Sequence, residues 1–198
     1  MNDVLEKAIA AHGGPQRWQA LKCLTVTAVS GGGLFALKGM PQDPTPREQT
    51  VTLQEENASV FPFGHPDWRT RFSPHRVAIE TIAGVVVQER ADPRNSFDGH
   101  DLLTPWDPLH RAYFNGYAMW TYLTTPFFMT MPGFEVTEIA HWQEGAERWR
   151  GCEYDFPMKS PATAKSKTFT SARTFCCAGT IITSTSPAHS RSRNTSAM

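Results

Sequence analysis

The first pattern along the chain is a helical repeat of hydrophobic positions near the N-terminus. Apolar residues recur every three or four positions over residues 4–11, and Asn2 or Asp3 precedes them as a candidate N-cap. The glycines at positions 13–14 are expected to end this helix, and the proline after them to begin a second short turn that contains Trp18. The chain is therefore predicted to open with two short helices.

Alternation between apolar and polar positions dominates the following sequence and predicts β-strands. The predicted strands cover residues 24–28, 49–55, 76–82, 85–90, 134–142 and 147–156. The glycines at 31–33 predict a bend within a strand that continues into residues 34–37, and prolines and a glycine are expected to keep residues 57–75 irregular. Turn residues at 83–84 and 143–145 predict hairpins. The pattern is typical of an α+β fold with a single long antiparallel sheet.

A further helical stretch is unusual because apolar and aromatic residues occur almost all the way round it. Asp107 and Pro108 supply a cap and a first turn, and the helix is expected to run to about Thr124. One stripe should pack on the sheet, with Gly116 allowing close approach; it consists of Leu109, Tyr113, Gly116, Trp120, Leu123 and Phe127. The other side must meet more core, a partner, a ligand or a membrane surface.

The aromatic residues around this helix predict an apolar ligand pocket between the helix and the sheet. The predicted lining is Trp106, Tyr113, Phe114, Tyr117, Trp120, Tyr122 and Phe127, with Arg111 or tyrosine hydroxyls at the mouth. The alternative is that these residues form only core, since each large side chain contributes ~1.5–3 kcal/mol when buried.

Residues 8–18 read Ala-Ile-Ala-Ala-His-Gly-Gly-Pro-Gln-Arg-Trp and precede an alternating strand. With these residues the chain resembles the LolA/LolB-like superfamily of bacterial lipoprotein carriers. Through residues 96–99 and 106–128 it is similar to an uncharacterised bacterial subgroup, and this likeness covers most of residues 1–157 and none of residues 158–198. The resemblance implies a strongly curved antiparallel sheet, wrapped as an open barrel around the aromatic helix, whose concave side holds acyl chains in the carriers.

Composition narrows the function classes. Nineteen Lys and Arg side chains balance 19 Asp and Glu side chains, which removes the overall electrostatic basis for binding nucleic acid. No apolar run reaches the roughly 18 residues of a transmembrane helix, and the N-terminus lacks a secretory signal, so a cytoplasmic protein is expected. The four cysteines show neither disulfide-framework nor zinc spacing, and Cys23 and Cys152 are expected to be inert core thiols.

Charge is divided unequally between two parts of the chain. Residues 1–158 carry all 19 acidic and 13 of the 19 basic side chains, whereas residues 159–198 carry six basic and no acidic side chains and 16 serines and threonines. The simpler interpretation is a disordered basic tail. Because most amino acids have several codons, a nucleotide sequence that encodes residues 158–198 can, when it is read in a shifted frame, encode two strands around a Gly-Pro-Asp turn. We therefore hypothesise that a base lost between Pro157 and Met158 leaves the domain of residues 1–157 incomplete, which sequencing the gene there tests.

The densest group of acid–base or metal-ligating side chains consists of Asp98, His100, Asp101, Asp107 and His110. Their spacing matches no zinc signature, which makes Asp98, His100 and His110 weak metal candidates. The alternative is a loop held by Asx turns and a helix cap. His110 lies in a first helical turn and is expected to be neutral and hydrogen-bonded. The sequence contains no recognisable nucleophile motif or phosphate loop, and no cofactor is expected.

These observations favour a non-enzymatic protein that binds an apolar ligand, such as a lipid or an acyl chain, in a cavity between the sheet and helix 109–124. One alternative is an enzyme that acts on a hydrophobic substrate through Asp98, His100 and His110. The others are a protein-interaction module and, if the end is out of frame, a non-functional truncated product. Self-association through an exposed sheet edge is also expected.

Overall fold

The computed structural model of this protein describes residues 2–41, 44–155, 173–177 and 180–184. It is a mixed α+β structure with a six-stranded antiparallel sheet and two two-stranded sheets. The chain divides into a larger compact unit, residues 15–128, and a smaller one formed by residues 1–14 together with residues 129–198. The N-terminal helix thus belongs to the same unit as the C-terminal hairpins.

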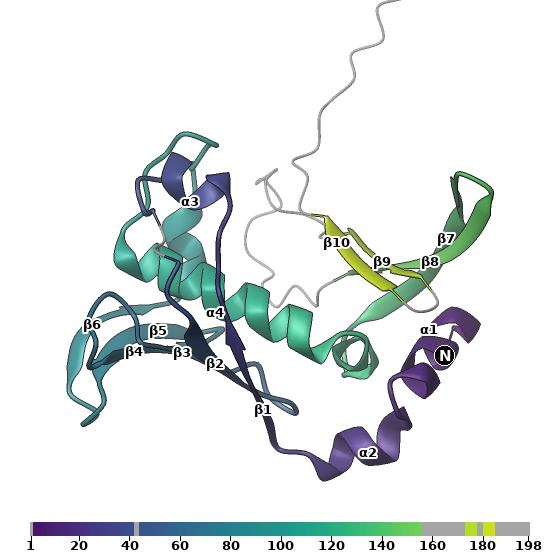
Figure 1. The fold of residues 1–198 in the computed structure, drawn as a ribbon, viewed down its shortest axis with the longest axis horizontal. Helices are drawn as coiled ribbons and strands as arrows, with labels where there is room; N and C mark the ends of the chain where they lie inside the picture. Colours follow the sequence, from purple (N-terminus) through teal and green to yellow (C-terminus); the bar gives the residue numbers. More distant parts are fainter. Residues whose placement is uncertain (1, 42–43, 156–172, 178–179, 185–198) are drawn as a thin grey trace, which may run out of the picture. The chain divides into compact units, whose positions relative to one another are not determined.

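The six-stranded sheet belongs to the larger unit. Its strands are β1 (Cys23–Ala28), β2 (Arg47–Thr52), β3 (Ala58–Phe61), β4 (Trp68–Ser73), β5 (Arg76–Thr81) and β6 (Val86–Ala91). They follow one another in sequence order, so β1 and β6 are the edges of an open sheet (Figure 1). The register places Val51, Ala58, Phe72 and Val77 in one row across β2–β5, and all four are buried. This row is part of the apolar face that receives the long helix.

The long helix α4 (Pro108–Thr124) packs on this face, against β2–β6 (Figure 1). Asp107 caps it, because its side chain accepts a hydrogen bond from the His110 backbone N–H at 2.8 Å. The main core cluster consists of Val60, Phe63, Val77, Ile79, Leu109 and Ala112. Gly116 lies directly on β4, where an added Cβ would overlap Cβ and Cγ of Phe72. The predicted helix and its predicted close approach at Gly116 are confirmed.

Short helices flank these elements: α2 (Gly14–Ala20), α3 (Gly33–Leu37), and the 3-10 helices η1 (Pro93–Phe97) and η2 (Phe127–Thr130). The prediction that the glycines at 31–33 bend one strand into another is wrong. Gly32, at φ 108°, is instead the N-cap residue of α3. Leu34, Ala36 and Leu37 are good helix formers and the turn buries Phe35, so propensity and burial both favour a helical turn here.

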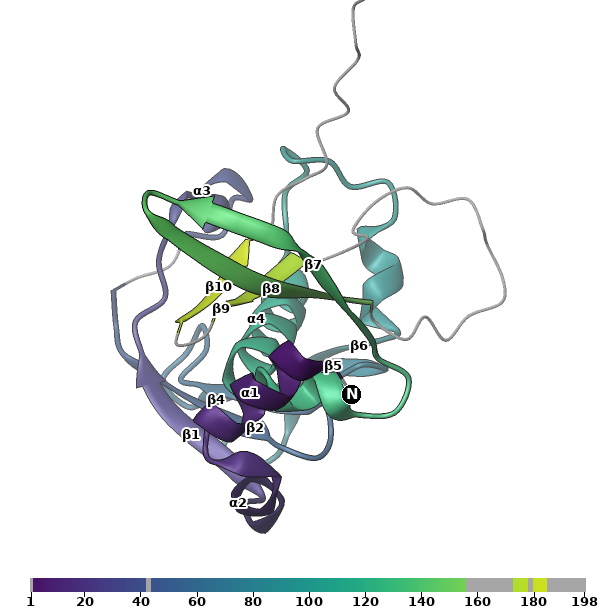
Figure 2. The ribbon, with the colours of Figure 1, turned by 90° about the vertical axis from the view of Figure 1, so that its right-hand side faces the viewer.

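The smaller unit combines α1 (Asp3–Ala11) with the hairpins β7 (Glu135–Glu144)–β8 (Glu147–Asp155) and β9 (Arg173–Cys177)–β10 (Thr180–Ser184). Figure 2 shows the long β7–β8 hairpin and α1. The Asn2 side chain caps α1 by accepting a hydrogen bond from the Val4 N–H at 2.8 Å. Arg150 on β8 bonds Asp3 at 2.6 Å and Glu138 at 2.7 Å, which ties the helix to the hairpin.

The positions of the predicted strands agree with the structure, whereas the predicted organisation into one sheet does not. The predicted strands are confirmed with small shifts at their ends. The single long sheet is wrong, because the 17-residue α4 follows β6 and the strands after it pair with each other in separate hairpins. Residues 57–75 are not wholly irregular, since β3 and β4 are short enough to fit between the prolines and the glycine. Cys152 is buried as expected, but Cys23 begins the edge strand β1 and is exposed.

Within the described part of the chain, no helix is long and apolar enough to cross a membrane. The frame hypothesis concerns residues 158–198. The structure describes only the β9–β10 hairpin there, and the other positions lie outside the described residues.

Candidate functional site

Burial differs sharply between the two faces of α4. The residues predicted to line a pocket fall into three classes: Trp106, Trp120 and Phe127 are buried, Arg111, Tyr113, Phe114 and Tyr117 are half-buried, and Tyr122 is 44% exposed. The half-buried rings lie in the first three turns of the helix. The candidate site is therefore the surroundings of the N-terminal half of α4.

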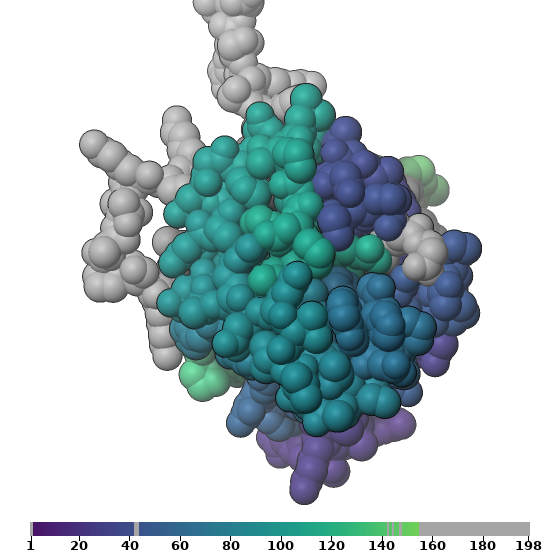
Figure 3. Space-filling view, turned by 90° about the vertical axis from the view of Figure 1, so that its left-hand side faces the viewer, coloured from purple at the N-terminus to yellow at the C-terminus, as the bar shows by residue number. Residues whose placement is uncertain are grey.

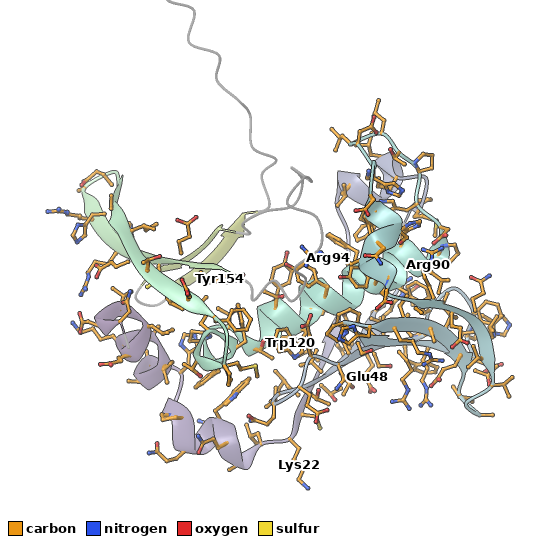
Figure 4. All side chains as sticks on the ribbon, turned by 180° about the vertical axis from the view of Figure 1, so that it is seen from behind. Lys22, Glu48, Arg90, Arg94, Trp120 and Tyr154 are labelled. Carbon is orange, nitrogen blue, oxygen red and sulfur yellow. The ribbon has the colours of Figure 1, made fainter. Side chains whose placement is uncertain are left out.

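Trp120, near the C-terminal end of α4, and Phe127, in η2, are fixed by contacts with other parts of the protein. Trp120 is 1% exposed, and its Nε1–H donates to the backbone oxygens of Thr52 at 3.0 Å and Glu55 at 2.9 Å (Figure 4). Phe127 stacks on Trp18 with ring centroids 4.3 Å apart. Both rings are thus held by the protein's own groups.

Phe97, at the end of η1, is the centre of an aromatic cluster beside the start of α4. Its ring centroid lies 4.8 Å from that of His110, 5.6 Å from that of Trp106 and 5.6 Å from that of Tyr113. The Tyr113 ring in turn meets Phe72 of β4 at 5.4 Å. The cluster therefore connects the sheet to the loop that precedes the helix.

The short helix α3 adds rings to the same cluster. The Phe35 ring lies 5.8 Å from Phe114 and 6.4 Å from Trp106, and Trp106 lies 5.2 Å from Phe114. The Arg111 guanidinium lies over Phe35 at 5.7 Å and over Phe63 at 5.3 Å, in cation–π geometry. Figure 3 shows the α3 segment in direct contact with the residues around the start of α4.

Next to these rings lie Lys38, His100 and Trp106, which we call the polar cluster. Lys38 is 5% exposed, and its Nζ donates to the backbone oxygens of Asp101 at 2.6 Å and Thr104 at 3.2 Å. Nζ lies 5.4 Å from the centre of the Trp106 ring, and the Trp106 backbone N–H donates to the Lys38 oxygen at 2.9 Å. Burial lowers the pKa of Lys38, although the Asp101 charge opposes this. Trp106 Nε1 and His100 Nδ1 are buried without a hydrogen-bond partner among the described residues.

His110 uses both ring nitrogens within the protein. Its Nδ1 accepts a hydrogen bond from the Asp107 backbone N–H at 3.2 Å, and its Nε2 contacts the Ser96 oxygen at 3.2 Å. His110 Nδ1 also lies 2.9 Å from Asp107 Oδ1, and the predicted hydrogen-bonded imidazole is confirmed. Burial opposes ionisation of Asp107, but hydrogen bonds from Arg90 and the His110 N–H outweigh it and lower the pKa of Asp107. This carboxylate and imidazole thus stabilise the start of α4.

The loop before α4 is held by its own carboxylate. Asp101 Oδ1 accepts hydrogen bonds from the backbone N–H groups of Leu103 at 2.9 Å and Thr104 at 2.8 Å, which form an Asx turn. The Thr104 hydroxyl and these N–H groups lower the pKa of Asp101. Asp98 is exposed. Among the described residues no group of three or more His, Cys, Asp and Glu side chains could hold a metal ion. Asp101 therefore has a structural role.

Glu56, between β2 and β3, adds an unusual acid to the site. Its side chain is half-buried, and burial raises its pKa to about 7 although the charges of Arg94 and His75 oppose this. Figure 4 shows Arg94 beside α4. Tyr113 and Tyr117 stack with ring centroids 6.5 Å apart, and burial also raises the pKa of Tyr113. The charge of Arg94 lowers the pKa of Tyr113, whereas the charge of Glu56 raises it. The ionisation of Glu56 is therefore linked to that of Tyr113 on α4.

Sequence reasoning missed Lys38, Glu56 and Phe97 as site residues. The groups around Lys38 come from residues 101–106, and those around Glu56 (His75, Arg94 and Tyr113) come from three separate segments, so no local pattern brings them together. Phe97 had an indirect signal, because residues 96–99 carry part of the family resemblance.

Comparisons with protein-family models, curated proteins and solved structures found no match to this chain. The site itself must therefore carry the functional argument. Its rings offer apolar surface, and its polar cluster offers N–H groups. Asp101, Asp107 and His110 are already bonded within the protein.

Proposed function

We propose that the protein binds an apolar ligand, a lipid or an acyl chain, against the half-exposed rings of α4 and catalyses no reaction. The observation that carries this proposal is the partial exposure of Phe114 and Tyr117 on a helix that buries another stripe on the sheet, where the half-buried Tyr113 packs against the core cluster. Neighbouring apolar rings that remain partly uncovered are typical of a binding surface.

The contact at Gly116 limits where such a ligand can lie. The helix touches Phe72 there, so the ligand would run along the outer face, past Phe114 and Tyr117, rather than beneath the helix. Burying one methylene contributes about 0.8 kcal/mol, so eight buried methylenes supply about 6 kcal/mol against the cost of association. A partly covered acyl chain is therefore a sufficient ligand.

We propose further that the sheet forms an open barrel of the LolA/LolB kind, as expected for a lipid carrier. Six antiparallel strands in sequence order, open edges and a helix on one face all support that architecture. Curvature of this sheet around α4 would shelter the ligand. The edge strands β1 and β6 would be the places where a second copy pairs.

An enzyme acting through Asp98, His100 and His110 is the weaker proposal. His110 has no free ring nitrogen, and the neighbouring Asp101 is engaged in its turn. A general base must be able to reach a substrate proton, and only His100 retains a buried unpartnered nitrogen among the described residues of this loop.

Replacing Phe114 or Tyr117 with serine is expected to weaken binding of an apolar ligand about tenfold, because each change removes ring surface from the bound chain. The measurement is a titration with the neutral fluorescent probe N-phenyl-1-naphthylamine. Val85→Ser is the matched control, since Val85 is 64% exposed in the β5–β6 turn. Equal probe affinity in all four proteins, with circular dichroism confirming their folding, would contradict the proposal.

A further inference from the structure

The polar cluster gives the proposed ligand site a preference for one kind of head group. We infer that Lys38, His100 and Trp106 bind the carboxylate of an anionic amphiphile such as a fatty acid, whose chain then follows the rings of α4. This inference rests on the proposed apolar-ligand binding and adds the chemical class of the ligand's polar end.

The indole N–H of Trp106 has no hydrogen-bond partner among the described residues. An indole N–H can only donate a hydrogen bond, so it requires an acceptor. The Trp106 residue is 9% exposed, and its Nε1 is buried without a partner among the described residues. Native proteins seldom leave such a donor unsatisfied. A ligand oxygen at this point would complete the site, and His100 Nδ1 offers a second unpartnered nitrogen in the same cluster.

The charge of the buried Lys38 side chain favours an anionic ligand. Within the part of the chain that the structure describes, its ammonium bonds two neutral backbone oxygens, and the Asp101 carboxylate acts on it as a nearby negative charge without forming a direct ion pair. An ammonium has three N–H donors, so one remains for a ligand. A buried charge is costly unless an opposite charge pairs with it. An anionic head group supplies that charge, whereas a cationic one would be repelled.

The polar cluster and the α4 rings are continuous. The Trp106 ring meets the Phe114 ring at 5.2 Å, and Tyr117 follows Phe114 three residues along the same helix. Residues three apart on a helix are neighbours on its surface. A head group held at Trp106 therefore leaves its chain beside Phe114 and Tyr117.

The test compares ligands that share one chain and differ in head group. Dodecanoate, dodecanol and dodecyltrimethylammonium displace N-phenyl-1-naphthylamine from the full chain at pH 7, the two ionic amphiphiles below their critical micelle concentrations and dodecanol below its solubility limit. Dodecanoate is expected to bind at least about tenfold more tightly than dodecanol, and the cationic amphiphile more weakly than dodecanol. Dodecanol binding as tightly as dodecanoate would overturn the head-group inference and leave the proposed function standing. Binding of none of the three would overturn both.

Substitutions test whether the polar cluster causes the preference for an anionic head group. Lys38→Met is expected to reduce the ratio of dodecanoate affinity to dodecanol affinity to about one, and Lys22→Met, at an exposed lysine before β1, to leave the ratio as in the wild type (Figure 4). If Lys38→Met fails to fold, Trp106→Phe keeps an aromatic ring without the N–H and should lower the same ratio several-fold. In ¹⁵N-labelled protein, the indole N–H signal that Trp106→Phe removes should shift on addition of dodecanoate. An unchanged ratio in Trp106→Phe, with no shift of that signal, would contradict the inference.

Discussion

Gly116→Ala is expected to lower the free energy of unfolding by about 1–2 kcal/mol. The new Cβ would overlap Cβ and Cγ of Phe72 and lie 2.9 Å from its Cδ1. Phe72 Cβ is attached directly to the backbone of β4, so the overlap requires α4 or the strand to move. Alanine favours a helix interior by about 1 kcal/mol over glycine, but overpacking a core costs about 1–3 kcal/mol or more. The clash should outweigh the gain.

Chemical denaturation measures this change, with Gly33→Ala as the control. A Cβ at Gly33, the first residue of α3, would have no atom within 4 Å. This substitution should therefore be neutral or slightly stabilising. A Gly116→Ala protein as stable as the wild type would show that α4 does not lie directly on β4.

Glu56→Gln is expected to stabilise the protein above pH 7 by about 3–4 kcal/mol and to have little effect near pH 4. The pKa of Glu56 is raised to about 7 in the folded state, whereas an unfolded glutamate titrates near 4.3. Each unit of pKa shift corresponds to about 1.4 kcal/mol. Glutamine keeps the shape of the protonated acid and cannot ionise, so it avoids the cost of a buried charge.

The sign of the effect follows from proton binding. Between about pH 4.3 and pH 7 the folded state holds a proton on Glu56 that the unfolded state has lost. The unfolding free energy of the wild type should therefore fall as pH rises through this window and level off above it. The Glu56→Gln protein should lack this fall. Arg94 and His75, which lower the pKa of Glu56, are present in both proteins, so the difference between the two pH profiles isolates Glu56.

Urea denaturation at a series of pH values provides the measurement, and Glu55→Gln is the matched control. Glu55 is the sequence neighbour of Glu56, and its side chain is exposed. The control should retain the pH dependence of the wild type. Parallel pH profiles of wild type and Glu56→Gln would contradict a buried, protonated acid at this position.

The sequence predicted those elements whose signals are local. The cap at Asp107, the following proline and the aromatic run were sufficient for α4, and alternation around a glycine turn was sufficient for β5 and β6. It did not predict α3, because a run of glycines reads as a break, whereas Gly32 at φ 108° acts as a cap. It also did not predict that the sheet divides, since strand pairing is decided between distant segments.

For the site, the sequence predicted the set of rings but not their roles. Trp120 and Tyr122 are two residues apart, yet their exposed fractions are 1% and 44%. That difference depends on which side of α4 the sheet covers, which periodicity cannot determine on a helix that is apolar nearly all round. Lys38 and Glu56 had no signal, because their environments are assembled by the tertiary fold.

Native mass spectrometry tests the central claim of apolar-ligand binding most directly. The full chain is purified from bacteria, measured as isolated, and measured again after addition of dodecanoate. The account predicts a bound lipid or a one-to-one dodecanoate complex whose population falls in Phe114→Ser and Tyr117→Ser. A folded protein that shows only its own mass, with and without dodecanoate, would contradict the account.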